Sequence, residues 1–207
     1  GDLVSEYEDI IVATDSMPAE MWRKSAIFSW VTMLLHSMKL GFFVLYYLHD
    51  RFSINYSDLI AYIVDKESDY DSILSRELNE FNEQLDRILC GHGRGRELPD
   101  FGNIYWDEEE ASFLRISNDI DTFYVELFEL VKRFLHDNDI KVDEAELQEI
   151  IDYQKIFICK IPGLLLRLMK IRSVFQGIDL MKVIIRAAKF LQILLNQNHL
   201  FSSILKN

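Results

Sequence analysis

The hydrophobic positions of residues 70–89 repeat with the spacing of an α-helix. Apolar side chains follow one another in steps of three and four residues, and Asp, Glu and Asn fill many of the positions between them. The stripe consists of Tyr70, Ile73, Leu74, Leu78, Phe81, Leu85, Ile88 and Leu89. This pattern predicts an amphipathic helix that packs its apolar face on a hydrophobic core.

Similar patterns predict helices on both sides of this stripe. They cover about residues 18–38, 40–48, 59–63, 107–114, 118–135 and 143–157. The first begins with a polar cap followed by Pro18, and Gly41 predicts a bend or break after it. Asp107 and Asp143 are each followed three residues later by Glu, which is a capping-box arrangement. Pro162-Gly163 is expected to end the last of these helices.

Two segments do not fit the helical pattern. Residues 7–14 contain the β-branched run from Ile10 to Val12 and predict a short strand. Residues 90–106 hold four glycines and Pro99, so we expect them to form the longest loop. The predicted fold class is mostly α: a multi-helix orthogonal or bundle-like domain with a short N-terminal strand. For the C-terminal tail, helix and minor β-structure at residues 164–175 are both open.

Charge divides the chain. Its net charge of -12 combines +8 on residues 155–207, where nine Lys and Arg face one acidic residue, with -20 on residues 1–154. We therefore expect three parts: 1–15 as the end of a preceding domain or a linker, 16–160 as an acidic helical domain, and 161–207 as a basic amphipathic tail packed on it. The acidic balance argues against a nucleic-acid partner.

Composition also bears on the compartment. Cys90 and Cys159 lie far apart and form no disulfide framework, and no signal peptide is visible, so a cytoplasmic location is expected. The 14 uncharged residues from Ser25 to Met38 raise the question of a membrane span. Continuing such a span would place Lys39 in the bilayer at a cost of roughly 2.5–3.5 kcal/mol, which favours a buried helix instead.

Candidate catalytic and metal motifs are all incomplete. The glycine-rich segment 91–96 follows a helix and lacks the Lys-Ser/Thr pair of a phosphate loop, so a surface loop is favoured. Four carboxylates at 107–110 are explained by helix capping, and residues 136–139 lack the remaining ligands of a calcium loop. The five histidines form no metal motif. We expect no catalytic, cofactor-binding or metal-binding residue within this chain.

Several stretches together resemble a known family. They are Tyr7–Pro18 running into Trp22, Phe28-Ser29-Trp30 and His36, then Tyr47-Leu48-His49, Phe101–Trp106, Glu109–Leu114, Phe123-Tyr124 and Tyr153-Gln154. In this order they are similar to the C-terminal helical region of cobalamin-binding radical S-adenosylmethionine proteins, a group called magnesium-protoporphyrin monomethyl ester cyclase-like. The resemblance covers about residues 5–160 and does not include the basic tail.

The resemblance implies an accessory role. In that family, upstream domains hold the iron-sulfur cluster, S-adenosylmethionine and cobalamin, and neither C-x-x-x-C-x-x-C nor D-x-H-x-x-G occurs here. The chain would then cover the active site of those domains or shape the choice of a small-molecule substrate, without catalysis of its own. Five aromatic and imidazole side chains are expected to face that substrate: Trp30, His36, Tyr47, His49 and Trp106.

Two alternatives stay open. The two histidines of this set, His36 and His49, are also explained as core residues satisfied by hydrogen bonds. The chain as a whole could instead be a helical binding module whose basic tail docks a protein partner or an anionic membrane surface.

Overall fold

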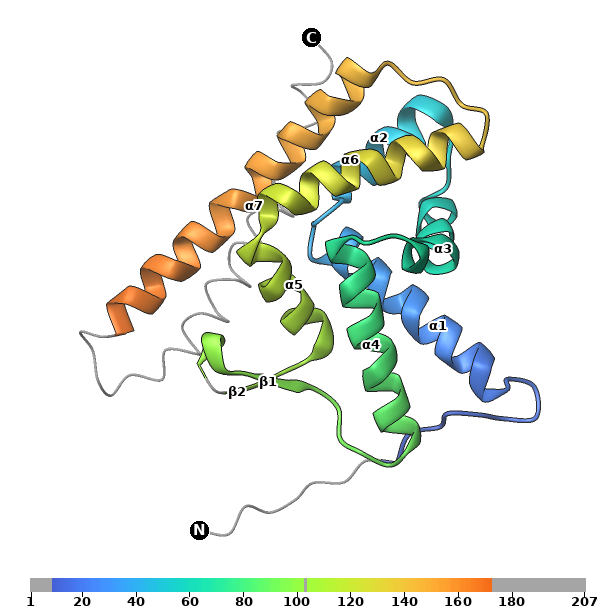
Figure 1. The fold of residues 1–207 in the computed structure, drawn as a ribbon, viewed down its shortest axis with the longest axis vertical. Coiled ribbons are helices and arrows are strands. Elements are labelled where there is room, and N and C mark those ends of the chain that lie inside the picture. The colour runs from blue at the N-terminus through green and yellow to red at the C-terminus, as the bar shows by residue number, and fades with distance from the viewer. Residues whose placement is uncertain (1–8, 103, 173–207) are drawn as a thin grey trace. The chain divides into compact units, whose positions relative to one another are not determined.

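A computed structural model describes residues 9–102 and 104–172 and confirms the mostly α fold class (Figure 1). Its α-helices are α1 (Ala19–Thr32), α2 (Phe42–Phe52), α3 (Tyr56–Lys66), α4 (Ile73–Leu89), α5 (Glu108–Asn118), α6 (Ile120–Asp137) and α7 (Glu144–Arg172). A π-helical turn covers Met33–Ser37, and 3-10 turns cover Glu67–Asp69 and Pro99–Phe101. Strands β1 (Arg96–Leu98) and β2 (Ile104–Trp106) form an antiparallel pair.

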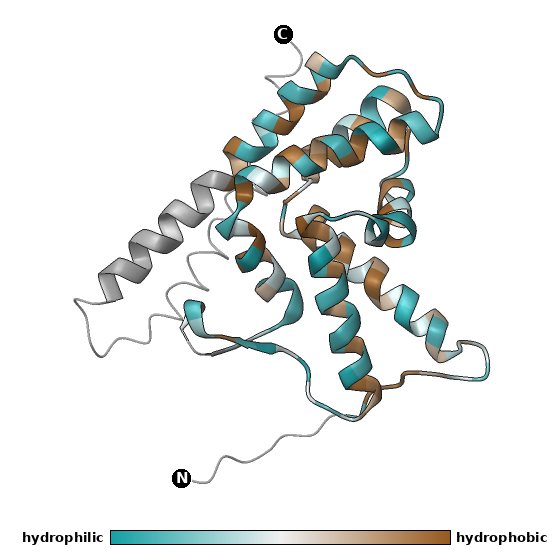
Figure 2. Ribbon diagram, in the orientation of Figure 1, coloured by the Kyte–Doolittle hydropathy of each residue, from teal (hydrophilic) through white to brown (hydrophobic). Residues whose placement is uncertain are grey.

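One hydrophobic core holds the helices of residues 19–158 together. Helix α1 packs against α3 and α4, and α6 packs against α3, α4 and α5. The stripe predicted over residues 70–89 becomes α4, whose Ile73, Leu74, Leu78 and Leu85 are buried. Hydrophobic and hydrophilic residues both occur along α4 and α6 (Figure 2), and it is the hydrophobic ones that enter the core.

The predicted break at Gly41 is confirmed. Residues 38–41 separate the π-helical turn from α2, and the chain turns by 91° there. Lys39 adopts a left-handed conformation with φ of 69°, which a continuous helix cannot contain. A Cβ on Gly41 would lie 3.1 Å from Cδ2 of Leu35, so the small residue allows α2 to begin against the preceding turn.

Side chains from α6 and α7 satisfy the backbone groups that this break exposes. Gln154, which is fully buried, donates from Nε2 to the carbonyl oxygen of Lys39 at 2.6 Å and accepts the N–H of Phe43 at 2.8 Å. The hydroxyl of Tyr124 donates to the carbonyl oxygen of Leu40 at 3.0 Å. Buried backbone groups without partners are costly, so these contacts allow the break to lie inside the core.

The strand predicted over residues 7–14 is wrong at the positions that the structure describes. Residues 9–13 form no strand, and Thr14 makes only an isolated bridge with Met17. The β-branched run has no neighbouring strand to pair with among the described residues, and Ile11 is 72% exposed. Local β-propensity alone does not form a strand without a partner. Residues 7 and 8 lie outside the description.

The loop predicted over residues 90–106 contains the only β-hairpin of the described residues. Arg96 pairs with Trp106 and Leu98 pairs with Ile104, so the two strands enclose the 3-10 turn at Pro99–Phe101. Gly102 has φ of 101° at the end of that turn, a conformation that glycine adopts without strain. The glycines and the proline correctly predicted turns in this segment. The short strands β1 and β2 between those turns were not predicted.

The helix starts predicted from capping residues are largely confirmed. Asp143 accepts the N–H of Ala145 at 2.9 Å from its side chain, directly before α7. At α5, which begins directly after Asp107, the Asp107 side chain makes no capping bond. The carboxylate of Asp107 is therefore available for other contacts.

Helix α7 continues past the point where Pro162-Gly163 was expected to end it, so that prediction is wrong. A proline inside a helix costs about 3 kcal/mol, and the 29-residue backbone of α7 continues despite that loss. The chain divides into two compact units, Gly1–Ile158 and Cys159–Asn207. Helix and strands were both open for residues 164–175, and residues 164–172 are helical as part of α7. Residues 173–207, which make up most of the basic tail expected over 161–207, lie outside the described part.

Within residues 9–102 and 104–172, none of the individual helices has the length and apolar character needed to cross a membrane. Residues Ala19–Ser37 and Phe42–Phe52 meet the criterion only when taken together, as a pair bent by 91°.

Candidate functional site

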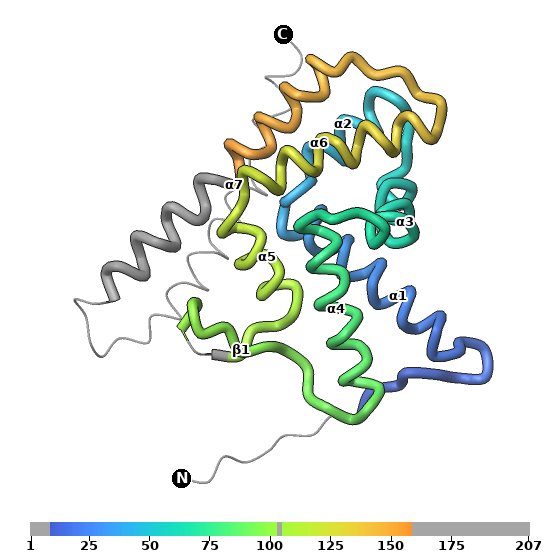
Figure 3. Tube along the Cα trace, viewed as in Figure 1, coloured from blue at the N-terminus to red at the C-terminus, as the bar shows by residue number. Residues whose placement is uncertain are grey.

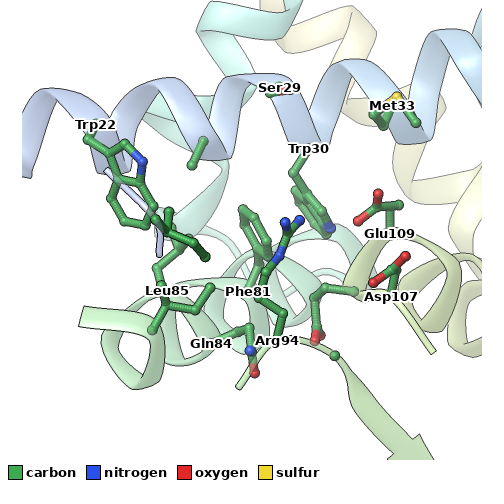
Figure 4. A pocket seen from close by; sticks show the side chains of 15 residues that line it. Trp22, Ser29, Trp30, Met33, Phe81, Gln84, Leu85, Arg94, Asp107 and Glu109 are labelled. Atoms are coloured by element: carbon green, nitrogen blue, oxygen red, sulfur yellow. The ribbon is translucent and has the colours of Figure 1, made fainter. Parts of the chain in front are cut away.

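A cavity of about 270 Å³ lies between α1, α4, the loop after α4 and the start of α5 (Figure 4). Figure 3 shows how the chain reaches it: after α4 the loop passes below α5 to β1. The cavity lies within the first compact unit. Its lining residues are Ile10, Trp22, Ala26, Ser29, Trp30, Met33, Phe81, Gln84, Leu85, Ile88, Arg94, Gly95, Asp107, Glu108 and Glu109.

Aromatic side chains form one wall of this cavity. Trp30 of α1 stacks on Phe81 of α4 with ring centroids 5.1 Å apart and planes inclined by 9°. Trp22 lines the cavity two turns earlier on α1. Trp30 is 3% exposed, so its ring is fixed by packing as well as by stacking. The wall therefore offers a rigid aromatic surface to a ligand.

The loop between α4 and β1 forms a second wall and is held at two points. Gln84 donates from Nε2 to the carbonyl oxygen of Gly93 at 3.0 Å. Gly95 has φ of 83°, and a Cβ at this position would lie only 2.9 Å from the carbonyl oxygen of Trp106. The close approach of these two backbones fixes the end of the loop, and Arg94 between the glycines lines the cavity.

A third wall is the first turn of α5, which carries Asp107, Glu108 and Glu109. Glu108 is 4% exposed and accepts from Nη2 of Arg115 at 3.2 Å. The guanidinium of Arg115 also forks onto both carboxylate oxygens of Glu77 on α4, at 2.6 to 3.0 Å. Burial acts to lower the pKa of Arg115, but its hydrogen bonds to Glu77 and Glu108 raise it overall. These contacts join α4 and α5 beneath the cavity.

Strand β1 contributes a second arginine to the same charged cluster. Nε of Arg96 lies 3.6 Å from Oε2 of Glu108, and the Arg96 guanidinium pairs with Glu80 of α4. Glu108 thus stands between two arginines at the N-terminal end of a helix, where the macrodipole also favours negative charge. The cluster positions α5 so that Asp107 and Glu109 lie at the cavity.

Several buried polar atoms along the cavity have no hydrogen-bond partner among the described residues. They are Nε1 of Trp30, Oε1 of Gln84 and Oε2 of Glu108, although the last is near Arg96. Figure 4 shows the Trp30 indole nitrogen on the side of its ring that faces the carboxylates of Asp107 and Glu109. Neither of those carboxylates has an ion-pair partner in the described part of the chain. Buried polar groups are usually paired, so these atoms are available to hydrogen-bond a further molecule, water included.

Of the five side chains expected to face a substrate, only Trp30 lines the cavity. His36 and His49 instead gather around Tyr56, at ring-centroid distances of 5.9 and 5.5 Å. A hydrogen bond of 3.0 Å joins Nδ1 of His49 to the carbonyl oxygen of Ile54. Burial, and then the charge of Lys39, lower the pKa of His36. Ring packing accounts for His36, and a hydrogen bond together with ring packing accounts for His49.

The remaining two expected residues are not among the lining residues, although Trp106 directly precedes Asp107. Tyr47 is buried on α2, and burial together with the nearby Glu146 carboxylate raises the pKa of its hydroxyl to about 12. Trp106 ends β2, and its Nε1 is buried without a partner among the described residues. The structure thus does not bring the five side chains together on one surface.

The cavity residues that the sequence did not identify include members of three segments assigned to other roles. Arg94 was placed in a surface loop, and Asp107 to Glu109 were explained as helix capping. Gln84 and Phe81 lie on the amphipathic α4, where nothing in the periodicity distinguishes a cavity residue from a core residue. The sequence feature that could have grouped these residues is the break in the helical pattern at residues 90–106. A short hairpin there reverses the chain, so the residues that flank it can pack against the preceding helix α4.

No three His, Cys, Asp or Glu side chains gather as potential metal ligands within residues 9–102 and 104–172. The charged cluster under the cavity is neutralised in part by its own arginines, which suits a structural and positioning role. Comparisons of the sequence with protein-family models and with curated proteins gave no match.

Proposed function

We propose that this chain is a cytoplasmic accessory domain of a larger enzyme, which binds a small molecule at the cavity beside Trp30 and does no chemistry itself. The observation that carries the proposal is the cavity. A rigid aromatic wall faces unpaired carboxylates across it, and the buried indole nitrogen of Trp30 has no partner among the described residues. Apolar walls with a few convergent polar groups are typical of ligand sites.

The parent enzyme that we propose is a cobalamin-dependent radical S-adenosylmethionine enzyme. The support is the sequence resemblance over about residues 5–160, in which Trp30 belongs to one of the matching stretches. The cluster, S-adenosylmethionine and cobalamin would be held by upstream domains of the same protein. In this arrangement the accessory domain would shape the choice of substrate.

The first test is the coding sequence upstream of Asp2. A reading frame that continues for several hundred residues and encodes three closely spaced cysteines supports this parent. A start codon at this point contradicts it.

The second test uses the full-length enzyme with Trp30→Phe, which keeps an aromatic ring on Phe81 but removes the indole N–H. We expect the KM for the parent's substrate to rise while the melting temperature changes little. Trp106→Phe is the matched control, because its indole nitrogen is also buried without a described partner but does not line the cavity. Unchanged KM and turnover in the Trp30 variant would contradict a ligand role for the cavity.

The second candidate function is a binding module that docks an anionic membrane surface through its basic tail. Its support is the charge of +8 on residues 155–207. Co-sedimentation with vesicles containing phosphatidylserine, using the full chain and a chain without residues 164–207, separates the two functions. Binding that requires the tail and is reversed by salt would favour this candidate.

A further inference from the structure

We infer that the cavity beside Trp30 selects a small planar organic cation whose charged end carries several N–H donors, such as an amidine or guanidinium attached to an aromatic ring. This inference rests on the proposed function and specifies the ligand class. It follows from the charges, the hydrogen-bonding groups and the aromatic wall of the cavity.

Charge is the first argument. The ionisable groups that line the cavity are the three carboxylates of Asp107, Glu108 and Glu109 and the single guanidinium of Arg94. Arg115 and Arg96 contact Glu108 from below, so its charge is offset within the protein. No described cation pairs with Asp107 or Glu109. The excess negative charge at the cavity therefore comes from these two groups, and a cationic ligand would offset it.

Hydrogen-bonding capacity is the second argument. Oε1 of Gln84 has no described donor, and the carboxylates of Asp107 and Glu109 add four acceptor oxygens. A planar fork of N–H groups matches a carboxylate in two parallel hydrogen bonds, so a ligand rich in N–H donors satisfies these acceptors. An anionic ligand would find Arg94 as the single positively charged side chain on the lining, beside the neutral donors of Trp22, Ser29 and Trp30.

Shape is the third argument. Trp30 and Phe81 lie nearly parallel, and Figure 4 shows Asp107 and Glu109 beside the edge of the Trp30 ring that carries the indole nitrogen. An aromatic ligand can contact this wall while its charged end reaches the carboxylates, and aromatic faces also attract cations. The volume of about 270 Å³ is slightly below the usual range for ligand pockets, so a ligand of one or two rings fits.

The test uses three probes of similar shape and different charge: benzamidine, benzamide and benzoate. The chain has three tryptophans, so the indole N–H signals in a proton-nitrogen correlation spectrum are few, and Trp→Phe variants assign them. We expect benzamidine to shift the Trp30 signal in a saturable manner and to leave that of Trp106 in place. Benzamide should bind at least about tenfold more weakly, because it lacks the charge-assisted hydrogen bonds.

Two variants identify the groups responsible. Asp107→Asn should weaken benzamidine binding about tenfold, and it should fold normally because the Asp107 side chain makes no capping bond and Asn caps a helix equally well. Arg94→Gln should strengthen benzamidine binding about threefold by removing a like charge. Circular dichroism checks that both variants keep the helical fold.

The opposite pattern would overturn the inference. If benzoate shifts the Trp30 signal more strongly than benzamidine, and Arg94→Gln abolishes that shift, the cavity selects anions and the ligand class is wrong, while a ligand role stands. If none of the three probes shifts the signal, the selection inferred here fails. The KM of the full-length Trp30→Phe enzyme then decides the proposed function separately.

Discussion

Arg115 joins two buried carboxylates beneath the cavity. Its guanidinium contacts Glu77 and Glu108, which are 5% and 4% exposed. Replacing it by Met would leave two buried carboxylates without their main partner, and breaking a buried pair costs about 3–5 kcal/mol. We therefore expect Arg115→Met to lower the free energy of unfolding by that amount in urea titrations.

Arg76→Met is the matched control for this prediction. Arg76 pairs with Asp71 at 3.0 Å, but both side chains are exposed, at 58% and 95%. Exposed pairs contribute about 0–1 kcal/mol, and Met is a helix former similar to Arg, so the control should change stability little. Equal losses in the two variants would show that the buried network does not depend on Arg115.

His36 provides a pH dependence. Its pKa is lowered, first by burial and then by the charge of Lys39, so the folded state binds a proton less readily than the unfolded chain. The stability associated with neutral His36 is present above the unfolded pKa of about 6.5 and is lost as pH falls through the lowered value. We expect the free energy of unfolding to fall less between pH 7.5 and 5 in the His36→Gln variant than in the unsubstituted chain. An identical fall in both proteins would contradict this reasoning.

At the residue scale, the sequence located Trp30 at the cavity but not its partners there. Trp30 belongs to the aromatic stretch Phe28-Ser29-Trp30, whose composition predicted a ligand-facing surface. Placing Gln84 and Arg94 at the cavity requires knowing that the loop after α4 folds back against α4. That contact depends on long-range packing, which local sequence does not show. His36 and His49 show the reverse case, in which notable residue types are satisfied by Tyr56 and a backbone carbonyl instead of facing the cavity.

At the scale of elements, the loop after α4 contains three glycines. Comparing them distinguishes the cost of a left-handed backbone from the cost of a steric clash at Cβ. Gly95 has positive φ and its Cβ would clash with the carbonyl oxygen of Trp106, whereas Gly91 has φ of 81° with no atom within 4 Å of a Cβ. For Gly93 there is neither a close contact nor a positive φ. The three positions therefore distinguish backbone strain from steric clash.

Alanine at each of these glycines should give a graded series in urea unfolding. The free energy of unfolding of Gly93→Ala should stay within about 0.5 kcal/mol of that of the unsubstituted chain. Gly91→Ala should lower it by about 1–2 kcal/mol, because alanine is strained in the left-handed conformation. Gly95→Ala should lose more than Gly91→Ala, because the clash adds to the strain. If Gly95→Ala were as stable as Gly93→Ala, the hairpin would not depend on this close approach.

The elements themselves were predictable where local sequence decides them. Periodicity identified α4 and α6, and Asp143 marked the start of α7, because capping and amphipathic burial act within a few residues. The hairpin of residues 96–106 and the missing strand at residues 9–13 depend on whether a partner strand is present. That information is not local, so β-propensity at Ile10 to Val12 was misleading.

At the scale of the whole molecule, the end of the first compact unit is set by a few side chains of α7. Phe43 of α2 packs edge-on against Tyr153 and Phe157, with ring centroids 4.9 and 5.2 Å apart, and Ile158 is fully buried. Gln154 satisfies the backbone at the break before α2. The first unit thus needs the chain up to Ile158.

Two truncations test this boundary. A chain ending after Ile158 keeps every one of these contacts, so we expect it to retain a cooperative urea transition with coincident circular dichroism and tryptophan fluorescence. A chain ending after Asp152 is only six residues shorter but lacks Gln154, Phe157 and Ile158. It would leave Phe43 without its two aromatic neighbours, and the carbonyl oxygen of Lys39 and the N–H of Phe43 without Gln154, at about 1–3 kcal/mol for each unpaired group, against a total stability of about 5–15 kcal/mol. We expect it to lose the cooperative transition, and equal behaviour of the two truncated chains would show that α7 does not complete the core of the first unit.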